Sequence, residues 1–320
     1  MQATIEQPIP VGISQCLMGD AVRFNASHKH SPLCTQKLGR LFALKPFCPE
    51  VAIGMATPRP AIRLVGEAAS PRVLGSKNPN MDLTVPLQHY AEQVSQAHPE
   101  LCGFILMQKS PSCGMERVKV YRDNGHPADG TGSGAFAARL MARNPLLPVE
   151  EEGRLHDPVL CENFVTRVIV YSQWRELQRD GLTSTRLLSF HARHKYLAMA
   201  HQQNLYRQLG PLLADLRQTD LYITAERYFA LLMQCLKTPA KRSGHSNALQ
   251  HLAGHFKRVL KPQEKQELSQ LIHDYRRGTV PLVVPITLLK HHLLNHPDPY
   301  LGEQAYLQPH PAELSLRNAI

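Results

Sequence analysis

In the first half of the chain, apolar residues fall in short runs separated by glycine, proline, serine and charged residues, which is typical of β-strands. Such runs cover residues 11–15, 104–108 and 118–122. Between them, apolar residues recur at helical spacing over residues 85–101, and residues 134–144 predict a shorter helix. Strands that alternate with helices predict an α/β fold with a mostly parallel sheet. In such a sheet, ligands bind beyond the carboxyl ends of the strands.

The pattern becomes helical after about residue 183, where apolar stripes alternate with Gly or Pro stop signals. The predicted helices cover residues 188–209, 225–236, 245–260, 262–277 and 285–294, with an extended stretch at 280–285. Before them, residues 145–158 predict a loop and residues 161–174 a helix that leads into the second half. The sequence therefore predicts an α/β N-terminal domain with a mostly parallel sheet (residues 1–173) and an all-α C-terminal domain (residues 174–320).

The chain has 320 residues, of which 43% are hydrophobic and 19% charged, enough for one large core or two ordinary ones. No apolar run is long enough to span a bilayer and the N-terminus lacks a signal-peptide profile, so we expect a cytoplasmic protein without a membrane partner. Seven cysteines, an odd number spread over a long chain, argue against a disulfide framework. Metal binding, catalysis and simple burial remain as explanations for them.

Positive charge is concentrated in the second half. The net charge is +10, and residues 174–320 hold 19 Lys+Arg against 11 Asp+Glu, whereas the first 173 residues hold 17 against 15. Eleven of the seventeen histidines also lie in the second half. A basic domain indicates a polyanionic partner, most simply RNA or DNA, although a basic surface that only keeps the protein in solution gives the same pattern.

Three cysteines stand where a strand-like run meets a turn: Cys16 before Leu-Met-Gly, Cys48 before Pro-Glu, and Cys113 before Gly. Three thiolates that converge from loops can hold an iron–sulfur cube and leave its fourth iron open. A zinc site is the alternative, although structural zinc sites usually close with four protein ligands and no fourth is evident. Three of the other cysteines lie in apolar or helical segments and are expected to be buried, namely Cys102, Cys161 and Cys235. Cys34 could lie near a site.

Polar residues near these cysteines are candidates for chemistry. Glu50 follows Cys48 by two positions, so it could act as a general base in the same pocket, or be a solvated surface residue. Ser110 and Ser112 could supply hydroxyl donors or cap the turn before Cys113. Arg59 could grip a phosphate or a carbonyl oxygen, or lie on the surface.

In the second half, His194 and Lys195 lie in one predicted helix, and Lys241, Arg242 and His245 form a basic turn before another. A metal site is disfavoured because no carboxylate or cysteine joins these histidines. Backbone phosphate binding and hydrogen bonding in the core are the two remaining interpretations.

These motifs resemble known families. The first half resembles the TudS-type thiouracil desulfidases through Ser14-x-Cys16-Leu-x-Gly19, Arg23-Phe24, Phe47-Cys48-Pro49-Glu50-Val51, Thr57-Pro58-Arg59 and Lys109-Ser110-Pro111-Ser112-Cys113-Gly114. The second half resembles the YbgA-like helical domains through Phe190-His191-x-x-His194-Lys195, Ala198-Met-Ala-His201 and Arg242-x-Gly244-His245. The fused arrangement is similar to the RudS-type desulfidases, which are associated with removing sulfur from thiouracil and from 4-thiouridine in tRNA.

The resemblance implies a [4Fe-4S] cluster with one free iron, and it assigns roles to residues of this chain. The implied cluster ligands are Cys16, Cys48 and Cys113, and the implied acid–base or positioning residues are Glu50 and Ser110. Beside these, the candidate substrate- or RNA-binding residues of the chain are Arg23, Arg59, Ser112, His194, Lys195, Lys241, Arg242 and His245. One departure is that Asn25 stands where the family commonly has an Asp-Gly-Gly-like stretch. If that aspartate assists catalysis, the neutral Asn25 alters rate or substrate choice.

The expected function is therefore non-redox, hydrolytic desulfidation of thiouracil or 4-thiouridine, either free or in thiolated tRNA, without DNA as a partner. Two other classes stay open. One is a cluster- or zinc-stabilised RNA-binding protein without catalysis, and the other is a cluster-dependent hydratase or dehydratase of a small metabolite. A redox sensor is disfavoured because the chain lacks a Cys-x-x-Cys pair.

Overall fold

The computed structural model describes residues 7–216 and 218–320. The contacts within the chain divide it into two compact units, the first ending at His156 and the second beginning at Asp157. The expected boundary after residue 173 is therefore too late, because it falls inside the continuous helix α4 (Pro158–Arg179). In the described part of the chain, no helix has both the length and the apolar character needed to cross a membrane.

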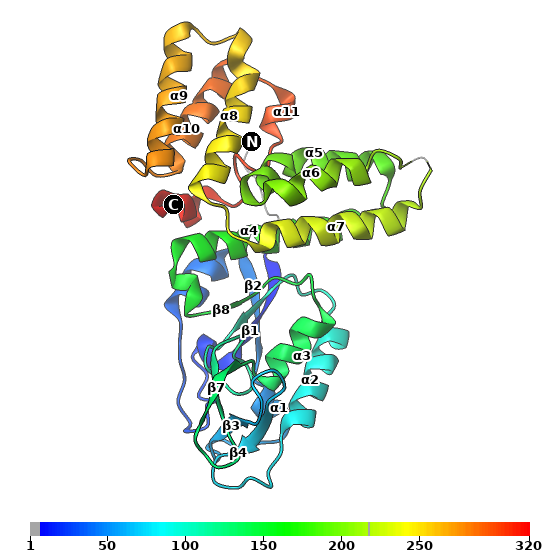
Figure 1. Cartoon of the computed structure of the whole chain (residues 1–320), viewed down its shortest axis with the longest axis vertical. Coiled ribbons are helices and arrows are strands. Elements are labelled where there is room, and N and C mark those ends of the chain that lie inside the picture. Colours follow the sequence, from blue (N-terminus) through cyan, green and yellow to red (C-terminus); the bar gives the residue numbers. More distant parts are fainter. Residues whose placement is uncertain (1–6, 217) are drawn as a thin grey trace. The chain divides into compact units, whose positions relative to one another are not determined.

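The first unit contains the expected parallel sheet (Figure 1). Its strands are β1 (Ile9–Ser14), β2 (Phe42–Phe47), β5 (Phe104–Leu106) and β8 (Val149–Glu151), in the order β2-β1-β5-β8. All three pairings are parallel, and Ser14 at the end of β1 lies opposite Phe47 at the end of β2. The carboxyl ends of neighbouring strands thus meet at one edge of the sheet.

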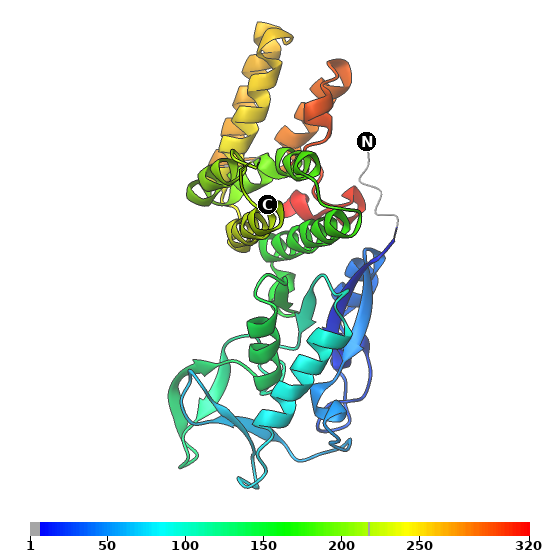
Figure 2. The same ribbon diagram turned by 90° about the vertical axis from the view of Figure 1, so that its right-hand side faces the viewer.

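Two helices cover this sheet. Helices α2 (Thr84–Ala97) and α3 (Ala135–Arg143) pack side by side in both views (Figure 1, Figure 2). The Phe136 ring of α3 meets the Phe104 ring of β5 with centroids 5.9 Å apart. Gly12 of β1 has no side chain because Phe104 fills the space that a Cβ would take. Close packing of these apolar groups fixes β1 and β5 relative to the helices.

A second sheet was not expected. It consists of β3 (Ile62–Val65), β4 (Arg72–Gly75), β6 (Val118–Tyr121) and β7 (Pro127–Gly132) in the order β4-β3-β6-β7, with antiparallel outer pairs and a parallel central pair. Its core includes Leu64, Val73 and Val120, each with no exposed surface. The predicted loop at 145–158 is also partly wrong, because it contains β8.

The second unit is helical, as expected. Its longer helices are α4, α5 (Ser184–His201), α6 (Gln203–Leu212), α7 (Leu221–Lys237), α8 (Arg242–His255), α9 (Pro262–Arg277) and α10 (Val283–Asn295), followed by the short α11 (Pro299–Gly302). The predicted helix at 188–209 is two helices, because the backbone is extended at Gln202. The stretch expected to be extended at 280–285 already enters α10 at Val283.

Helices α8 and α9 lie side by side (Figure 1, Figure 2), and α8 also packs on α5. The α5–α8 contact depends on Gly244, because a Cβ there would overlap the backbone oxygen of Ala200. Gly254, near the other end of α8, faces open space.

A Gly244→Ala variant is expected to lower the free energy of unfolding by about 1–3 kcal/mol, because the two backbones must separate. The matched Gly254→Ala variant is expected to raise it by up to about 1 kcal/mol, since alanine favours the helix. Urea denaturation checks both values. Equal effects of the two substitutions would contradict the packing argument.

Candidate active site

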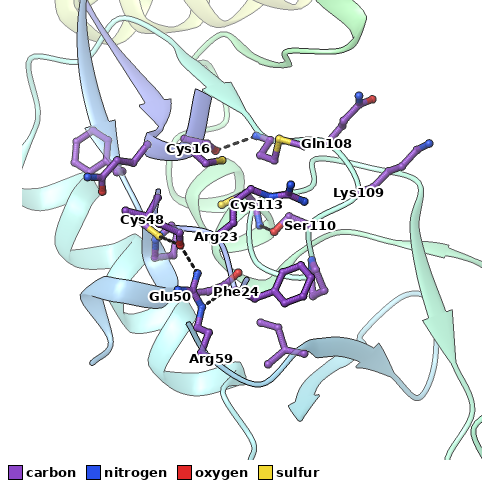
Figure 3. A pocket seen from close by; sticks show the side chains of 18 of the residues that line it. Cys16, Arg23, Phe24, Cys48, Glu50, Arg59, Gln108, Lys109, Ser110 and Cys113 are labelled. Atoms are coloured by element: carbon purple, nitrogen blue, oxygen red, sulfur yellow. Dashed lines mark hydrogen bonds and ion pairs between the residues drawn. The ribbon is translucent and has the colours of Figure 1, made fainter. Parts of the chain in front are cut away.

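A cavity of about 350 Å³ opens in the first unit, where β1, β2 and β5 end. Cys16, Cys48 and Cys113 all line it, and Figure 3 shows their side chains around the same space. The volume is within the range of about 300–1,000 Å³ that is typical of ligand pockets. The structure thus brings together three cysteines that are 32 and 65 residues apart in the sequence.

Each thiol is placed by the backbone that follows a strand. Cys16 lies in a 3-10 turn (Gln15–Met18) directly after β1, and its carbonyl accepts the N–H of Lys29 at 2.8 Å. Cys48 is the N-cap of the short helix α1 (Pro49–Ala52), which starts where β2 ends. Cys113 lies in the loop after β5, and its N–H donates to the hydroxyl of Ser110 at 3.1 Å.

The thiols of Cys16 and Cys113 are buried, and that of Cys48 is half-buried. Burial, together with the neighbouring Cys48, raises the pKa of Cys16 to about 11, although Arg23 opposes the shift. Burial also raises the pKa of Cys48 and raises that of Cys113 well above the ordinary value. Metal binding at these thiols must therefore displace their protons, as it does at other thiolate sites.

Three cysteine thiols at one cavity are the donor set that an iron–sulfur cluster requires. In the described ranges 7–216 and 218–320, no three His, Cys, Asp or Glu side chains are gathered closely enough to hold one metal ion. A four-iron cube is wider than one ion and takes a thiolate at each of three separate corners. Among the described residues that line the cavity, no imidazole and no fourth thiol is present to occupy the last corner. The chemistry of the three thiols therefore fits such a cluster.

Glu50 is the carboxylate of the cavity, and two donors hold it. Its Oε2 accepts a hydrogen bond from Nε of Arg59 at 2.7 Å, and its Oε1 accepts one from the Ser112 hydroxyl at 2.8 Å. Arg59 also donates to the carbonyl of Val22 at 2.7 Å and is almost fully buried. Charge-assisted hydrogen bonds of this kind fix a carboxylate in one orientation. Arg59 and Ser112 were expected to contact the substrate. In the structure both donate hydrogen bonds that orient the Glu50 carboxylate.

Ser110 shapes the loop that carries Cys113. Its hydroxyl oxygen accepts the N–H groups of Ser112 at 3.2 Å and Cys113 at 3.1 Å. This is the turn-capping arrangement, and it leaves the one hydroxyl hydrogen of Ser110 free to donate into the cavity that the residue lines.

Arg23 and Phe24 line the same cavity, with Phe24 43% exposed and the Arg23 guanidinium 6.0 Å from its ring centre. Asn25 is exposed, and its Oδ1 accepts a hydrogen bond from the Ser27 hydroxyl at 2.6 Å. Gln108 and Lys109 also line the cavity, and their side chains extend away from the three thiols (Figure 3). The cation of Arg23 and the aromatic ring of Phe24 are groups that can bind a planar, electron-rich ligand.

Two residues at strand ends, for which the sequence predicted no individual role, hold the backbone near the site. Ser14, the last residue of β1, accepts the N–H of Met107 at 2.9 Å with its hydroxyl oxygen. Glu151, the last residue of β8, accepts the N–H of Met115 at 2.9 Å, and its burial raises its pKa. Ser14 belongs to the Ser14-x-Cys16 motif, whereas Glu151 lies at the end of a strand that was not predicted.

The histidines expected to bind RNA are internal. His194 is 1% exposed, and its ring nitrogens contact the Phe190 carbonyl at 2.8 Å and Gln173 Oε1 at 3.0 Å. His245 is 2% exposed, and its Nδ1 lies 3.0 Å from the Tyr306 hydroxyl. Burial lowers the pKa of each to about 3, so both are neutral at pH 7. His194 and His245 therefore form hydrogen bonds in the protein core, which was one of the two interpretations of the sequence. The other interpretation, that these two rings bind backbone phosphates, is wrong.

The basic residues are differently placed. Lys241 and Arg242 are exposed at the start of α8, and Lys195 is half-buried beside the Tyr196 ring. Arg242 donates to the Tyr275 carbonyl at 3.0 Å. Lys241 lines a groove of about 570 Å³ together with Arg207 and with residues at the N-terminal ends of α6 and α8. Neither helix has a side-chain cap on its first amide groups.

Comparison with known proteins separates the same two regions. A family model described as 2-thiouracil desulfurase matches residues 11–152, and a model described as a protein of unknown function, DUF1722, matches residues 195–311. The uncharacterized protein YbgA of Escherichia coli (strain K12) is 34% identical over 162 residues, which cover 49% of this chain and 94% of YbgA.

A solved structure of the [4Fe-4S]-dependent thiouracil desulfidase TudS is 29% identical, and the match covers 46% of this chain and 93% of that chain with a TM-score of 0.37. The residues matched by the desulfurase model lie in the first unit, and those matched by the DUF1722 model lie in the second. The chain belongs to the YbgA family and carries, ahead of its YbgA-like helical domain, a domain of the 2-thiouracil desulfurase type.

Proposed function

We propose that this protein is a [4Fe-4S]-dependent desulfidase that replaces the thiocarbonyl sulfur of thiouracil, or of 4-thiouridine in tRNA, by oxygen. The observation that carries the proposal is the cavity in which three cysteine thiols lie together with a carboxylate held by two donors. The match to the desulfurase family supports the substrate class. The name of the TudS structure states a [4Fe-4S] dependence for that protein, and the cysteines here suit the same cofactor.

Cys16, Cys48 and Cys113 would hold the cluster. When bound, it supplies an open iron that can take a soft thiocarbonyl sulfur and polarise the ring carbon as a Lewis acid. The rest of the cavity then has to orient the ring and deliver water. Phe24 offers an aromatic face for the pyrimidine, and Arg23 offers a cation for its remaining carbonyl oxygen.

Glu50 is the proton acceptor in this proposal. Arg59 and Ser112 each use one lone pair of a different carboxylate oxygen, so the remaining lone pairs can accept a hydrogen bond from water. As the water oxygen bonds to the ring carbon, Glu50 takes its proton, the carbon–sulfur bond breaks, and the proton passes to the departing sulfur. The ring C=S and H₂O become ring C=O and H₂S, so no oxidant or reductant is consumed.

The direct test is anaerobic reconstitution with iron and sulfide, followed by incubation with 2-thiouracil and with 4-thiouridine-containing tRNA. We expect about four irons per chain, loss of the near-ultraviolet thione absorbance, and one sulfide released per thione lost. If cluster-loaded protein leaves that absorbance unchanged, the desulfidase proposal is wrong. A hydratase or a non-catalytic RNA-binding protein would then be the better interpretation.

A Glu50→Gln variant is expected to lose about 10²–10⁴-fold in kcat, the usual contribution of a general acid–base group. The amide keeps the shape of the side chain and cannot take a proton. Stopped assays of sulfide release, with iron content measured on the same sample, check this. Glu67→Gln, which changes an exposed glutamate in the same unit, serves as control. A Glu50→Gln variant with full activity and a full cluster would rule out Glu50 as the base.

The helical domain is proposed to hold tRNA. Its positive charge and the groove lined by Arg207 and Lys241, with uncapped amides of α6 and α8 at its edge, suit a phosphate group. RNA bases treated by such enzymes must leave their stack to enter a pocket, so a second grip on the backbone is needed.

Lys241→Glu is therefore expected to weaken tRNA binding and to lower the slope of log affinity against log salt by about one, while turnover of free 2-thiouracil stays unchanged. Filter binding at several salt concentrations gives the slope. Lys265→Glu makes the same charge change at an exposed position of α9 and is the control. Equal losses in the two variants would show that net charge, and not this groove, governs binding.

A further inference from the structure

Ser14 is a cavity residue to which the proposed reaction gives no role. It is the last residue of β1 and 2% exposed, and its hydroxyl oxygen accepts the N–H of Met107, the residue after β5, at 2.9 Å. Ser14 therefore joins the ends of two neighbouring strands. One of these strands leads into Cys16 two residues later, and the other leads into the loop of Cys113.

The hydroxyl hydrogen of Ser14 still needs an acceptor. A serine hydroxyl has one hydrogen and two lone pairs, and the Met107 amide uses only a lone pair. A buried donor without a partner costs about 1–3 kcal/mol, so such groups are nearly always satisfied. The buried thiol of Cys113 lines the same cavity and is in hydrogen-bond contact with the Ser14 side chain.

We propose that Ser14 is a positioning residue that donates its hydroxyl hydrogen to Sγ of Cys113 and thereby withdraws electron density from this cluster ligand. The inference rests on the proposed function, because it takes Cys113 to be a thiolate bound to iron. A hydrogen bond to a ligand sulfur raises the reduction potential of an iron–sulfur centre. The same withdrawal makes the open iron a stronger acceptor for the sulfur of the substrate.

A purely structural role is the competing explanation, in which Ser14 only satisfies the Met107 amide. The two explanations differ in what they predict for the electronic properties of the loaded protein. Ser14→Ala removes both hydrogen bonds. Ser14→Thr keeps a hydroxyl in the same place and should restore whatever the hydroxyl provides.

The experiment measures the reduction potential and the visible sulfur-to-iron absorption of anaerobically reconstituted wild-type, Ser14→Ala and Ser14→Thr proteins, each with its iron content. We expect Ser14→Ala to shift the potential to more negative values and the absorption to longer wavelength, and Ser14→Thr to match the wild type. An unchanged potential in a fully loaded Ser14→Ala protein overturns the inference. A shifted potential in Ser14→Thr that equals that of Ser14→Ala also overturns it.

A second measurement covers the case in which Ser14→Ala takes up no iron. In the wild-type protein, exchange into D₂O should shift the iron–sulfur stretching bands in the resonance Raman spectrum, because the hydroxyl proton is exchangeable. The absence of any shift overturns the inference without a variant. Failure of the wild-type protein itself to take up a cluster would instead overturn the proposed function.

Discussion

A Cys113→Ser variant is expected to lose both the cluster and all measurable desulfidation. Cys113 is 7% exposed, so no solvent ligand can readily replace it, and a serine hydroxyl is too weak an acid to bind iron as an anion at neutral pH. The shape of the side chain is nearly conserved, so the fold should persist. The measurements are iron and sulfide per chain after anaerobic reconstitution, the visible absorbance, and 2-thiouracil turnover on the same sample.

The matched control is Cys235→Ser in the helical domain. Cys235 is also buried, but its thiol donates to the Ala198 carbonyl at 3.4 Å, a contact that a hydroxyl can also make. This variant should keep four irons and full turnover. If Cys113→Ser keeps a complete cluster, or if Cys235→Ser loses it, the assignment of ligands to the cavity is wrong.

The parts of the first unit that the sequence predicts are those in which apolar residues cluster. Strands β1, β5 and β6 are short apolar runs, and they were expected within two residues of their observed bounds. Strand β7 was missed because its sequence, Pro-Ala-Asp-Gly-Thr-Gly, lacks a large apolar residue and has low intrinsic preference for strands. Its pairing with β6 forms through a tight turn in which Gly125 has a positive φ of 84°. The Asn124-Gly125 pair was an available hairpin signal.

The candidate site also contains residues that the sequence could predict and residues that it could not. The three cysteines could be found because each follows an apolar run, and parallel strands bring their carboxyl ends to one edge. The hydrogen-bond partners of Glu50 could not be predicted from the sequence. Ser112 lies 62 residues away and reaches Glu50 only once β2 and the loop after β5 are folded. A basic or polar residue near a motif therefore has no assignable partner until the fold is known.

The histidines of the helical domain show the limit of charge counting. Eleven of them lie in the second half, but His194, His245 and His310 are buried and burial lowers their pKa values, to about 3, 3 and 4. They add no positive charge at pH 7 and serve internal hydrogen bonding. The electrostatic attraction for a polyanion therefore comes from the exposed lysine and arginine residues, such as Lys241.

Loss of the buried ion pair between Glu162 and Arg317 is expected to be the largest stability change in the helical domain. Glu162 of α4 is 4% exposed, and its Oε1 accepts a hydrogen bond from Nε of Arg317, near the C-terminus, at 2.9 Å. Burial alone would raise the pKa of Glu162, but Arg317, followed by His310, lowers it to about 2. Arg317→Met leaves the carboxylate buried without its cation, which costs about 3–5 kcal/mol of unfolding free energy at pH 7.

The measurement is urea unfolding followed by Trp174 fluorescence. Trp174 is the single tryptophan of the chain and is buried in α4, so its signal reports on the helical domain alone. Arg179→Met is the control, because Arg179 pairs with Asp180 at the surface, where an ion pair contributes about 0–1 kcal/mol. Equal destabilisation by the two substitutions would contradict the argument from burial.

Acidic pH gives the ion pair a characteristic signature. Because the folded protein holds the pKa of Glu162 below its ordinary value of 4.5, the pair stabilises the wild type above about pH 4.5 and loses this effect as the pH falls toward 2. In Arg317→Met, burial raises the same pKa, so protonation relieves the unpaired charge on acidification. The stability gap between wild type and variant should therefore narrow from pH 7 to pH 4.

The Glu162→Gln, Arg317→Met double variant should recover much of the lost stability at pH 7, because a neutral amide needs no cation. Its stability should also depend less on pH than that of the single variant. A double variant as unstable as Arg317→Met would mean that Arg317 acts through its hydrogen bond to the Tyr306 carbonyl, 2.5 Å away, and not through the charge on Glu162. The pH series thus separates the electrostatic contribution of Arg317 from its role in holding the C-terminal segment against α4.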